Sequence, residues 1–167
     1  MSPALAGRVV IGVLMAGEAW WSRRNERHLV LGGAVEPAGD VYRAMQLAYP
    51  GAFVAMAIEA WWTGQPAPFW MMMGAGVFVV AKLLKYWAMA SLGQRWSFRV
   101  LILRDAPLVT SGPYRMMRHP NYVAVVGEFI GAMLGLGAVV TGPLSLLAFA
   151  GLLRRRIAIE DAALGRR

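Results

Sequence analysis

The stretch Gly112-Pro113-Tyr114-Arg115-Met116-Met117-Arg118-His119-Pro120-Asn121-Tyr122 ends directly against an apolar run that begins at Val123. Pro113 and Pro120 each fix one backbone dihedral angle, so His119 is held on both sides just before the apolar run starts. Cationic, aromatic and imidazole side chains are crowded into the same loop. A rigid polar loop at the edge of a hydrophobic segment predicts a functional site at a membrane surface.

The overall composition is typical of an integral membrane protein. Of the 167 residues, 58% are hydrophobic and only 16% are charged, and the mean hydropathy is +0.50. Such a chain is too apolar for an ordinary water-soluble domain.

The chain has no cysteine and only two histidines, His28 and His119. Disulfides, iron–sulfur clusters and thiolate zinc sites are therefore excluded, and we predict no metal site. The formal net charge of +8 would suggest a nucleic-acid partner for a soluble protein. Here the arginines lie between apolar segments, so we predict membrane lipids as partners and no nucleic acid.

Five segments are compared with the roughly 20 apolar residues that a membrane-spanning helix needs. They are approximately 3–21, 44–62, 69–90, 122–140 and a shorter one at 143–153. A signal peptide is the other interpretation of the first segment, but Trp20-Trp21 followed by Arg23-Arg24 is typical of a helix stopping at the interface. Because no internal repeat or linker is visible, we predict a single all-α, polytopic membrane domain over residues 1–167.

Positive charge alternates between the connections of these segments. Nearly all arginines lie in 22–43, in 91–119 and in the tail from Arg154, whereas the turns 63–68 and 141–143 carry no charged residue. The positive-inside rule then predicts an outside N-terminus, and a cytoplasmic C-terminus and functional loop. A compact chain rich in Ala, Gly and Arg favours a bacterial source, and the expected location is then the bacterial inner membrane.

Three carboxylates fall within or near the predicted spans. Glu128 lies about 9 Å along the fourth helix from its start, at a rise of about 1.5 Å per residue. A carboxylate at that depth marks either a functional site or a buried pair with an arginine, and both interpretations are open. Glu18 and Glu59 lie nearer the interfaces, where snorkelling or a structural hydrogen bond is expected.

Arg156 and Glu160 are four residues apart, so a helix places them on one face, with Asp161 adjacent. One interpretation is a solvated ion pair of little energetic value. The other is a cofactor pocket, because the short connection before the fifth segment returns this helix to the side of the membrane where His119 lies. The positive end of the helix dipole at His119 and Tyr122 favours an electron-rich ligand group there.

Two segments together form a recognisable pattern, GPYRMMRHPNYVAVVGE at 112–128 and RRRIAIEDAAL at 154–164, preceded by KLLKYWAMASLGQRWSFRVLIL at 82–103. With these segments the chain resembles the isoprenylcysteine carboxyl methyltransferase family of membrane enzymes, which use S-adenosylmethionine. The resemblance covers approximately residues 82–164. It implies that this half forms a cytoplasmic pocket for S-adenosylmethionine from the Gly-Pro loop, the start of the fourth helix and the acidic tail.

The resemblance also implies roles for individual residues. The residues expected to contact the cofactor are Leu108, Val109, Gly112, Tyr114, His119, Pro120, Tyr122, Glu160 and Asp161. Arg156 and Glu160 are expected at the reaction centre, and Trp96, Arg99 and Glu128 are assigned to the methyl acceptor. The usual Glu-Glu of the family reads Glu160-Asp161 here, so Asp161 departs from the family pattern.

The expected reaction is O-methylation of a lipophilic small molecule that enters from the bilayer, at an alkylpyrone- or alkylresorcinol-like hydroxyl or a prenylcysteine-like carboxylate. Transfer from a sulfonium is an in-line displacement, so Arg156 is expected to hold an anionic acceptor oxygen. A neutral hydroxyl would also need a base, for which Glu160 or Glu128 is available. Phospholipid N-methylation, a sterol-reductase-like reaction with NADPH, and a small non-enzymatic transporter are the alternatives.

Overall fold

Helices make up almost all of the regular structure of the protein. The computed structural model describes residues 3–103 and 106–165. Its α-helices are α1 (Pro3–Leu31), α2 (Tyr42–Thr63), α3 (Pro68–Leu92), α4 (Pro120–Leu136) and α5 (Thr141–Ala163), with single 3-10 turns η1 (Gly93–Arg95) and η2 (Gly112–Arg115). Within the described ranges, the β structure is one isolated antiparallel bridge between Val35 and Ile102. The prediction of an all-α chain with five helices is confirmed.

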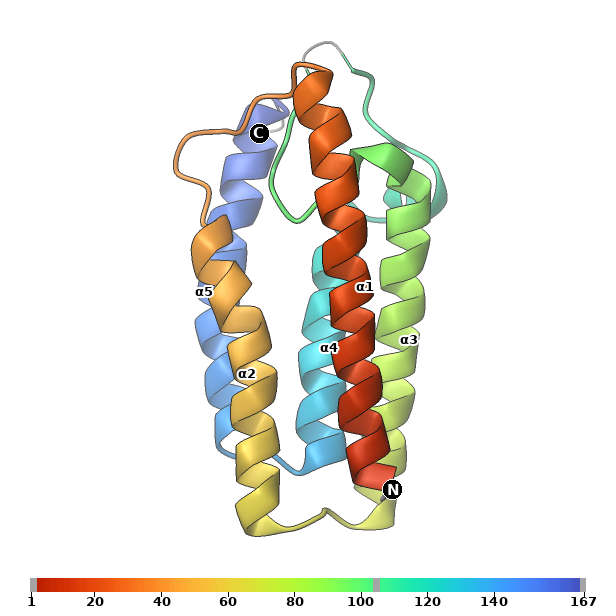
Figure 1. Cartoon of the computed structure of the whole chain (residues 1–167), viewed down its shortest axis with the longest axis vertical. Coiled ribbons are helices and arrows are strands. Elements are labelled where there is room, and N and C mark those ends of the chain that lie inside the picture. Colours follow the sequence, from red (N-terminus) through yellow and green to blue (C-terminus); the bar gives the residue numbers. More distant parts are fainter. Residues whose placement is uncertain (1–2, 104–105, 166–167) are drawn as a thin grey trace.

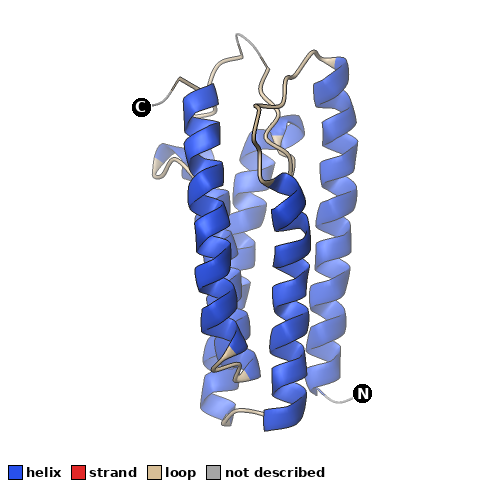
Figure 2. Ribbon diagram, turned by 90° about the vertical axis from the view of Figure 1, so that its left-hand side faces the viewer, coloured by secondary structure: helices blue, strands red, loops and turns tan. Residues whose placement is uncertain are grey.

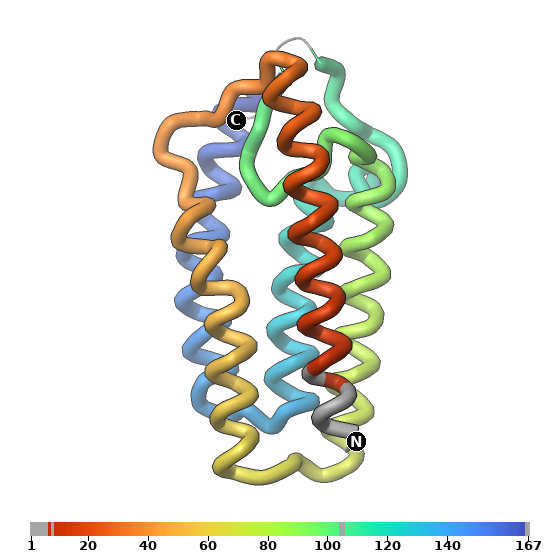
Figure 3. Tube along the Cα trace, viewed as in Figure 1, coloured from red at the N-terminus to blue at the C-terminus, as the bar shows by residue number. Residues whose placement is uncertain are grey.

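The five helices run side by side along the long axis of the molecule (Figure 1). The start of α1 and the short turns joining α2 to α3 and α4 to α5 lie at one end (Figures 1 and 2). The end of α1, the long segment between α3 and α4, and the last turns of α5 lie at the other end (Figure 3). The arginine-rich connections therefore gather at a single end of the bundle.

Within residues 3–103 and 106–165, one helical stretch is both long and apolar enough to cross a membrane. The apolar helical stretch Pro68–Arg95 is long enough, whereas α4 is apolar but has only 17 residues. Five membrane-spanning helices therefore stay a prediction, although five helices are present.

Two helices, α1 and α4, end next to glycines and not at charged residues. The sequence analysis ended the first segment near Trp21, but α1 continues to Leu31 and stops before Gly33, whose φ is +80°. Arginine and glutamate are good helix formers, so the charged residues after Trp21 do not end the helix. In the same way α4 ends at Leu136 because Gly137 is left-handed, with φ +68°. The fifth segment forms one continuous helix that carries Arg156 and Glu160 beyond the apolar part.

The close approach of α3 and α4 depends on glycines. A Cβ added at Gly131 would lie 2.6 Å from the backbone nitrogen of Phe78, and one added at Gly74 would overlap the backbone of Gly135. Small residues at such an interface let two backbones come together, as is common between membrane helices.

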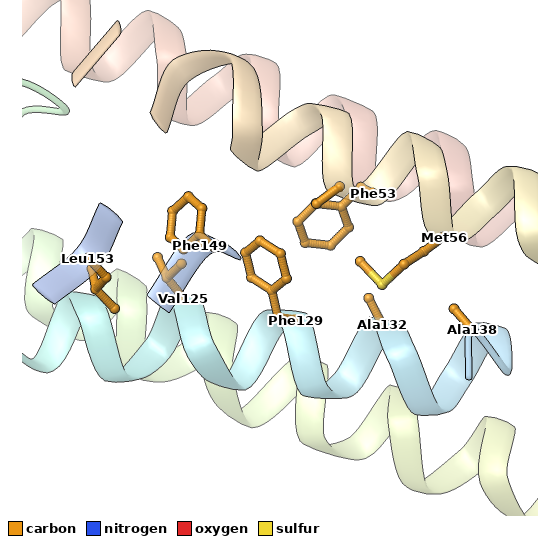
Figure 4. Packing of buried hydrophobic residues seen from close by; sticks show 9 residues of the cluster. Phe53, Met56, Val125, Phe129, Ala132, Ala138, Phe149 and Leu153 are labelled. Carbon is orange, nitrogen blue, oxygen red and sulfur yellow. The ribbon is translucent and has the colours of Figure 1, made fainter. Parts of the chain in front are cut away.

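Aromatic rings fill the space between α2, α4 and α5 (Figure 4). The ring centroids of Phe129 and Phe149 are 4.9 Å apart, and those of Phe53 and Phe129 are 5.5 Å apart. Met56, which is fully buried, extends this core along α2. Dense aromatic packing fixes the position of α5, and thereby of the polar residues that follow Leu153.

Two carboxylates and two lysines form a buried charge cluster, defined here as Glu18, Lys82, Lys85 and Glu128. Lys82 Nζ lies 2.6 Å from Glu18 Oε1 and 3.0 Å from Glu128 Oε1, and Lys85 Nζ lies 2.6 Å from Glu18 Oε2. All four side chains are almost completely buried. The expected arginine partner of Glu128 is therefore wrong, because two α3 lysines are nearer. Glu18 makes the structural hydrogen bonds that were one of its two expected roles, because α1 passes beside the same lysines.

Glu59 makes the structural hydrogen bonds that were expected of it. Its carboxylate accepts hydrogen bonds from the backbone nitrogens of Val140 (3.0 Å) and Thr141 (2.7 Å). These groups stand at the start of α5, where backbone N–H groups lack helical partners. Glu59 therefore joins α2 to the first turn of α5.

Candidate functional site

A cavity of about 370 Å³ opens at the loop-bearing end of the bundle, between the helices. It is lined by residues of α1, α2, α4 and α5, by the end of α3 and by the segment between α3 and α4. Much of its wall is apolar, including Met45, Val125, Phe149 and Leu153. Its volume falls within the range of about 300–1,000 Å³ that is usual for small-molecule sites.

The structure brings most of the predicted site residues to this cavity. Those that line it are Trp96, Arg99, Leu108, Val109, Tyr114, His119, Tyr122, Arg156 and Glu160. Gly112, Pro120, Glu128 and Asp161 are absent from the lining among the residues described. Their roles as ligand contacts stay predictions.

The loop before α4 and the end of α5 meet at His119. His119 Nε2 lies 3.1 Å from Asp161 Oδ1, and its ring stacks on that of Tyr122 with centroids 5.3 Å apart. The Tyr122 hydroxyl donates a hydrogen bond to Glu160. Pro120 begins α4 and is buried, which fixes the direction in which His119 enters the site. Segments about forty residues apart in sequence thus form one wall.

Arg156 is buried, with only 4% of its surface exposed, and has fixed partners on three segments. Its Nε donates to the Tyr122 hydroxyl at 3.0 Å, its Nη2 donates to the carbonyl oxygen of Phe98, and its Nη1 lies 3.5 Å from Asp40 Oδ1. The solvated Arg156–Glu160 pair is therefore not observed. The two residues are connected through the Tyr122 hydroxyl instead. A guanidinium has five N–H donors, so Arg156 retains donors for a ligand.

Gly112 is a glycine for reasons of packing. Its φ is +58°, and a Cβ there would overlap the Ser91 hydroxyl and approach Trp87 Nε1. Larger residues would push η2 away from the end of α3. Gly112 thus sets the position of Tyr114, which lines the cavity. Burial raises the pKa of the Tyr114 phenol, and the Glu160 carboxylate raises it further, so Tyr114 is a neutral hydrogen-bond donor at physiological pH.

The segment after α3 is anchored by its own polar contacts. Arg95 Nη1 donates to the carbonyl oxygen of Pro107 at 2.6 Å, which holds the start of the Leu108–Val109 wall. Arg99 forms an ion pair with Glu36, so its charge is already engaged. Among the described residues, the buried Trp96 Nε1 has no hydrogen-bond partner. The buried Asn121 Oδ1 also has no hydrogen-bond partner among the described residues, and Asn121 lines the cavity as well.

The sequence analysis missed several residues at the site, among them two that contact its predicted members. Asp40, in the connection between α1 and α2, faces Arg156, and Tyr49 in α2 lines the cavity. Asp40 stands beside a glycine in a polar loop and Tyr49 stands inside an apolar run. Neither has a local pattern that relates it to Arg156 or Glu128, because the contacts arise only where α2 and the connection before it pack against α4 and α5.

Comparison with known proteins gives a consistent set of relatives. The sequence profile of the isoprenylcysteine carboxyl methyltransferase (ICMT) family matches residues 72–166. YpbQ, an uncharacterized protein of Bacillus subtilis (strain 168), is 32% identical over 155 residues, which cover 93% of this chain and 92% of that protein. An uncharacterized protein of Haemophilus influenzae is 24% identical over 144 residues, covering 86% and 84% of the two chains. No solved structure matches significantly.

The family match includes both the loop with His119 and the helix end with Arg156 and Glu160, which are the segments that meet at the cavity. It also extends over more than half of the chain. The protein therefore belongs to the isoprenylcysteine carboxyl methyltransferase family.

Proposed function

We propose that this protein is a membrane-embedded methyltransferase that uses S-adenosylmethionine to methylate an oxygen of a lipophilic small molecule. Membership of the family indicates a membrane methyltransferase. The observation that carries the proposal for this chain is the contact of His119 with Asp161, beside the Tyr122–Glu160 hydrogen bond. These contacts build a polar wall at one end of a cavity whose other walls are largely apolar.

The residues of this wall fit S-adenosylmethionine by their chemistry. The cofactor carries an amino acid carboxylate and ammonium, ribose hydroxyls and a cationic sulfonium, and it supplies a methyl group on that sulfonium. Glu160 can accept hydrogen bonds from ammonium or hydroxyl groups, and Tyr114 can donate one. The buried Trp96 Nε1 and Asn121 Oδ1 offer one donor and one acceptor that the described residues leave without partners. An unpaired buried polar atom costs about 1–3 kcal/mol, which a bound ligand would recover.

Arg156 is the residue proposed to hold the acceptor oxygen. Contacts with Tyr122, Phe98 and Asp40 immobilise its guanidinium without using all of its donors. A preorganised cation stabilises an anionic oxygen without reorganising during the reaction. The surrounding apolar side chains exclude water, which strengthens this interaction.

The apolar walls favour an acceptor with a hydrocarbon tail. Such a tail could contact the apolar side chains that line the cavity, including Met45, Val125 and Phe149. We propose an alkylpyrone- or alkylresorcinol-like hydroxyl, or a prenylcysteine-like carboxylate, arriving from the bilayer. The proposed setting is a bacterial inner membrane, with the cavity mouth on the cytoplasmic side and the N-terminus outside.

The test uses the purified full-length protein in detergent with radiolabelled S-adenosylmethionine. We expect saturable cofactor binding, and transfer of label to an organic-soluble product when a bacterial lipid extract is added. Mass spectrometry should identify a product heavier by one methyl group and locate it on oxygen. Preference for a reduced nicotinamide dinucleotide over S-adenosylmethionine, or absence of label transfer to any lipid fraction, would contradict the proposal.

A further inference from the structure

The buried charge cluster reaches the cavity. Of its four members, Glu18 and Lys85 line the cavity wall, while Lys82 and Glu128 are absent from the lining given by the described residues. Tyr49 also lines the cavity and donates its hydroxyl proton to Glu128. The inner end of the cavity therefore carries polar groups that are separate from the polar wall at Arg156 and that none of the steps above uses.

This inner end lies further from the loop-bearing end of the bundle than Arg156 does. Arg156 Nη1 is 3.8 Å from Met45 Sδ, and Tyr49 follows Met45 by four residues in α2. One helical turn places Tyr49 about 6 Å further along the same face. Phe149 lies beside Tyr49, with ring centroids 6.0 Å apart. Leu153, which also lines the cavity, stands between Phe149 and Arg156 along α5. A ligand held at Arg156 would thus meet apolar side chains first and then a second polar level.

The hydrogen-bonding capacity of this level is only partly used. The Tyr49 hydroxyl donates a hydrogen bond to Glu128, which leaves its oxygen free to accept one from a ligand. The Lys85 ammonium has three donors, of which Glu18 Oε2 takes one at 2.6 Å and Glu128 Oε2 a second at 3.4 Å, so one donor is left for a ligand. Lys85 Nζ also lies over the Tyr49 ring, 5.2 Å from its centroid, so the two groups are neighbours. The formal charges of the cluster cancel, so the level is suited to a neutral hydroxyl, which both donates and accepts.

We propose that Tyr49 and Lys85 form a second polar subsite, which binds a hydroxyl of the acceptor other than the oxygen that is methylated. This inference rests on the proposed function, since it assumes that the acceptor lies between Arg156 and Tyr49. Tyr49 contacts the ligand directly. Glu128 is a positioning residue, because it is fully buried and acts through the hydroxyl of Tyr49.

The test compares the equilibrium binding of two probes to the full-length protein in detergent. One probe is a long-chain alkylphenol, and the other is the same molecule with a second hydroxyl on the ring. We expect about tenfold tighter binding of the dihydroxy probe, the value of roughly one hydrogen bond in a buried site. Tyr49→Phe should bring the affinity ratio close to one. Binding of S-adenosylmethionine, measured without acceptor, should be unchanged in this variant and shows that it is folded.

Tyr86→Phe is the matched control. Tyr86 follows Lys85 in α3 but is not among the described residues that line the cavity, so the affinity ratio should be retained. Equal binding of both probes to the unmodified protein, no binding of either, or a ratio that Tyr49→Phe does not change would overturn the subsite. Methyl transfer is measured separately in the same samples. A retained affinity ratio without methyl transfer would support the subsite and contradict the proposed reaction.

Discussion

The Nε of Arg156 donates a hydrogen bond to the hydroxyl of Tyr122 over 3.0 Å. That hydroxyl in turn donates to Glu160, so it serves both residues that the family resemblance assigned to the reaction centre. A neutral phenol between a cation and a carboxylate keeps the two charges apart while fixing both. Arg156 can then face an acceptor oxygen, and Glu160 can face the cofactor.

Tyr122→Phe should lower the methyl-transfer rate by about tenfold to a hundredfold. The change removes the hydroxyl that both charged partners contact, and a loss of this size corresponds to roughly one hydrogen bond to a charged group, about 1.5–3 kcal/mol. The ring, and therefore its stacking on His119, is preserved. The rate is measured as transfer of label from S-adenosylmethionine to the organic phase. An unchanged rate would show that the hydroxyl has only a structural role.

Arg156→Ala should reduce turnover more than cofactor affinity, because Arg156 is proposed to hold the acceptor. Its neighbour Arg155 is exposed on the same helix and provides the matched control. Arg155→Ala should leave both quantities unchanged. Equal effects of the two substitutions on the rate would contradict a specific role for Arg156.

His119→Ala should weaken S-adenosylmethionine binding, and Asp161→Ala should weaken it through the same contact. Because His119 Nε2 and Asp161 Oδ1 are 3.1 Å apart, a double-mutant cycle should give a coupling energy of about 0.5–3 kcal/mol. Binding is measured by equilibrium dialysis. His28→Ala changes the other histidine of the chain, which is exposed, and should have no effect. Strictly additive losses would mean that the two side chains act independently.

Gly131→Ala should lower the free energy of unfolding by about 1–3 kcal/mol, because the added methyl group must push α3 and α4 apart. The new Cβ would lie 2.6 Å from the backbone nitrogen of Phe78, which cannot move alone. Gly76→Ala meets open space and is the control. The stability of each variant is measured by thermal unfolding in detergent. A similar midpoint for the two variants would refute the close packing of α3 and α4.

The proposed orientation can be tested with single cysteines, because the natural chain has none. Gln65 lies in the turn between α2 and α3, Ala162 lies near the end of α5, and both are exposed. In bacterial spheroplasts, whose inner membrane is intact, a membrane-impermeant maleimide should label Gln65→Cys but not Ala162→Cys. The opposite pattern would invert the assigned topology.

Local patterns were sufficient to locate most helices. The predicted second and third segments, 44–62 and 69–90, lie within α2 (Tyr42–Thr63) and α3 (Pro68–Leu92). Apolar length and flanking glycine or proline are properties of neighbouring residues, so they can be read along the chain. The extension of α1 to Leu31 was missed because charge was taken as the helix end.

Partners far apart in sequence could not be assigned in the same way. For Glu128 an arginine was one of two expected partners, and the structure pairs it with Lys82 and Lys85 instead of an arginine. The Asp40 contact of Arg156 and the position of Tyr49 at the cavity had no signal in the sequence. Each depends on which face a helix turns toward its neighbours, and hydrophobic length does not specify that face.

The sequence by itself determined an apolar all-helical chain, its approximate helices, and a rigid loop followed later by an acidic helix end. These features depend on how proline and glycine affect the backbone and on the transfer energies of apolar side chains. Both are properties of neighbouring residues in the sequence. Only the tertiary structure decided that Tyr122 connects Arg156 to Glu160 and that a neutral charge cluster closes the inner end of the cavity. Those arrangements arise because glycine-mediated packing of α3 on α4 and the aromatic core behind α5 bring distant side chains within hydrogen-bonding distance.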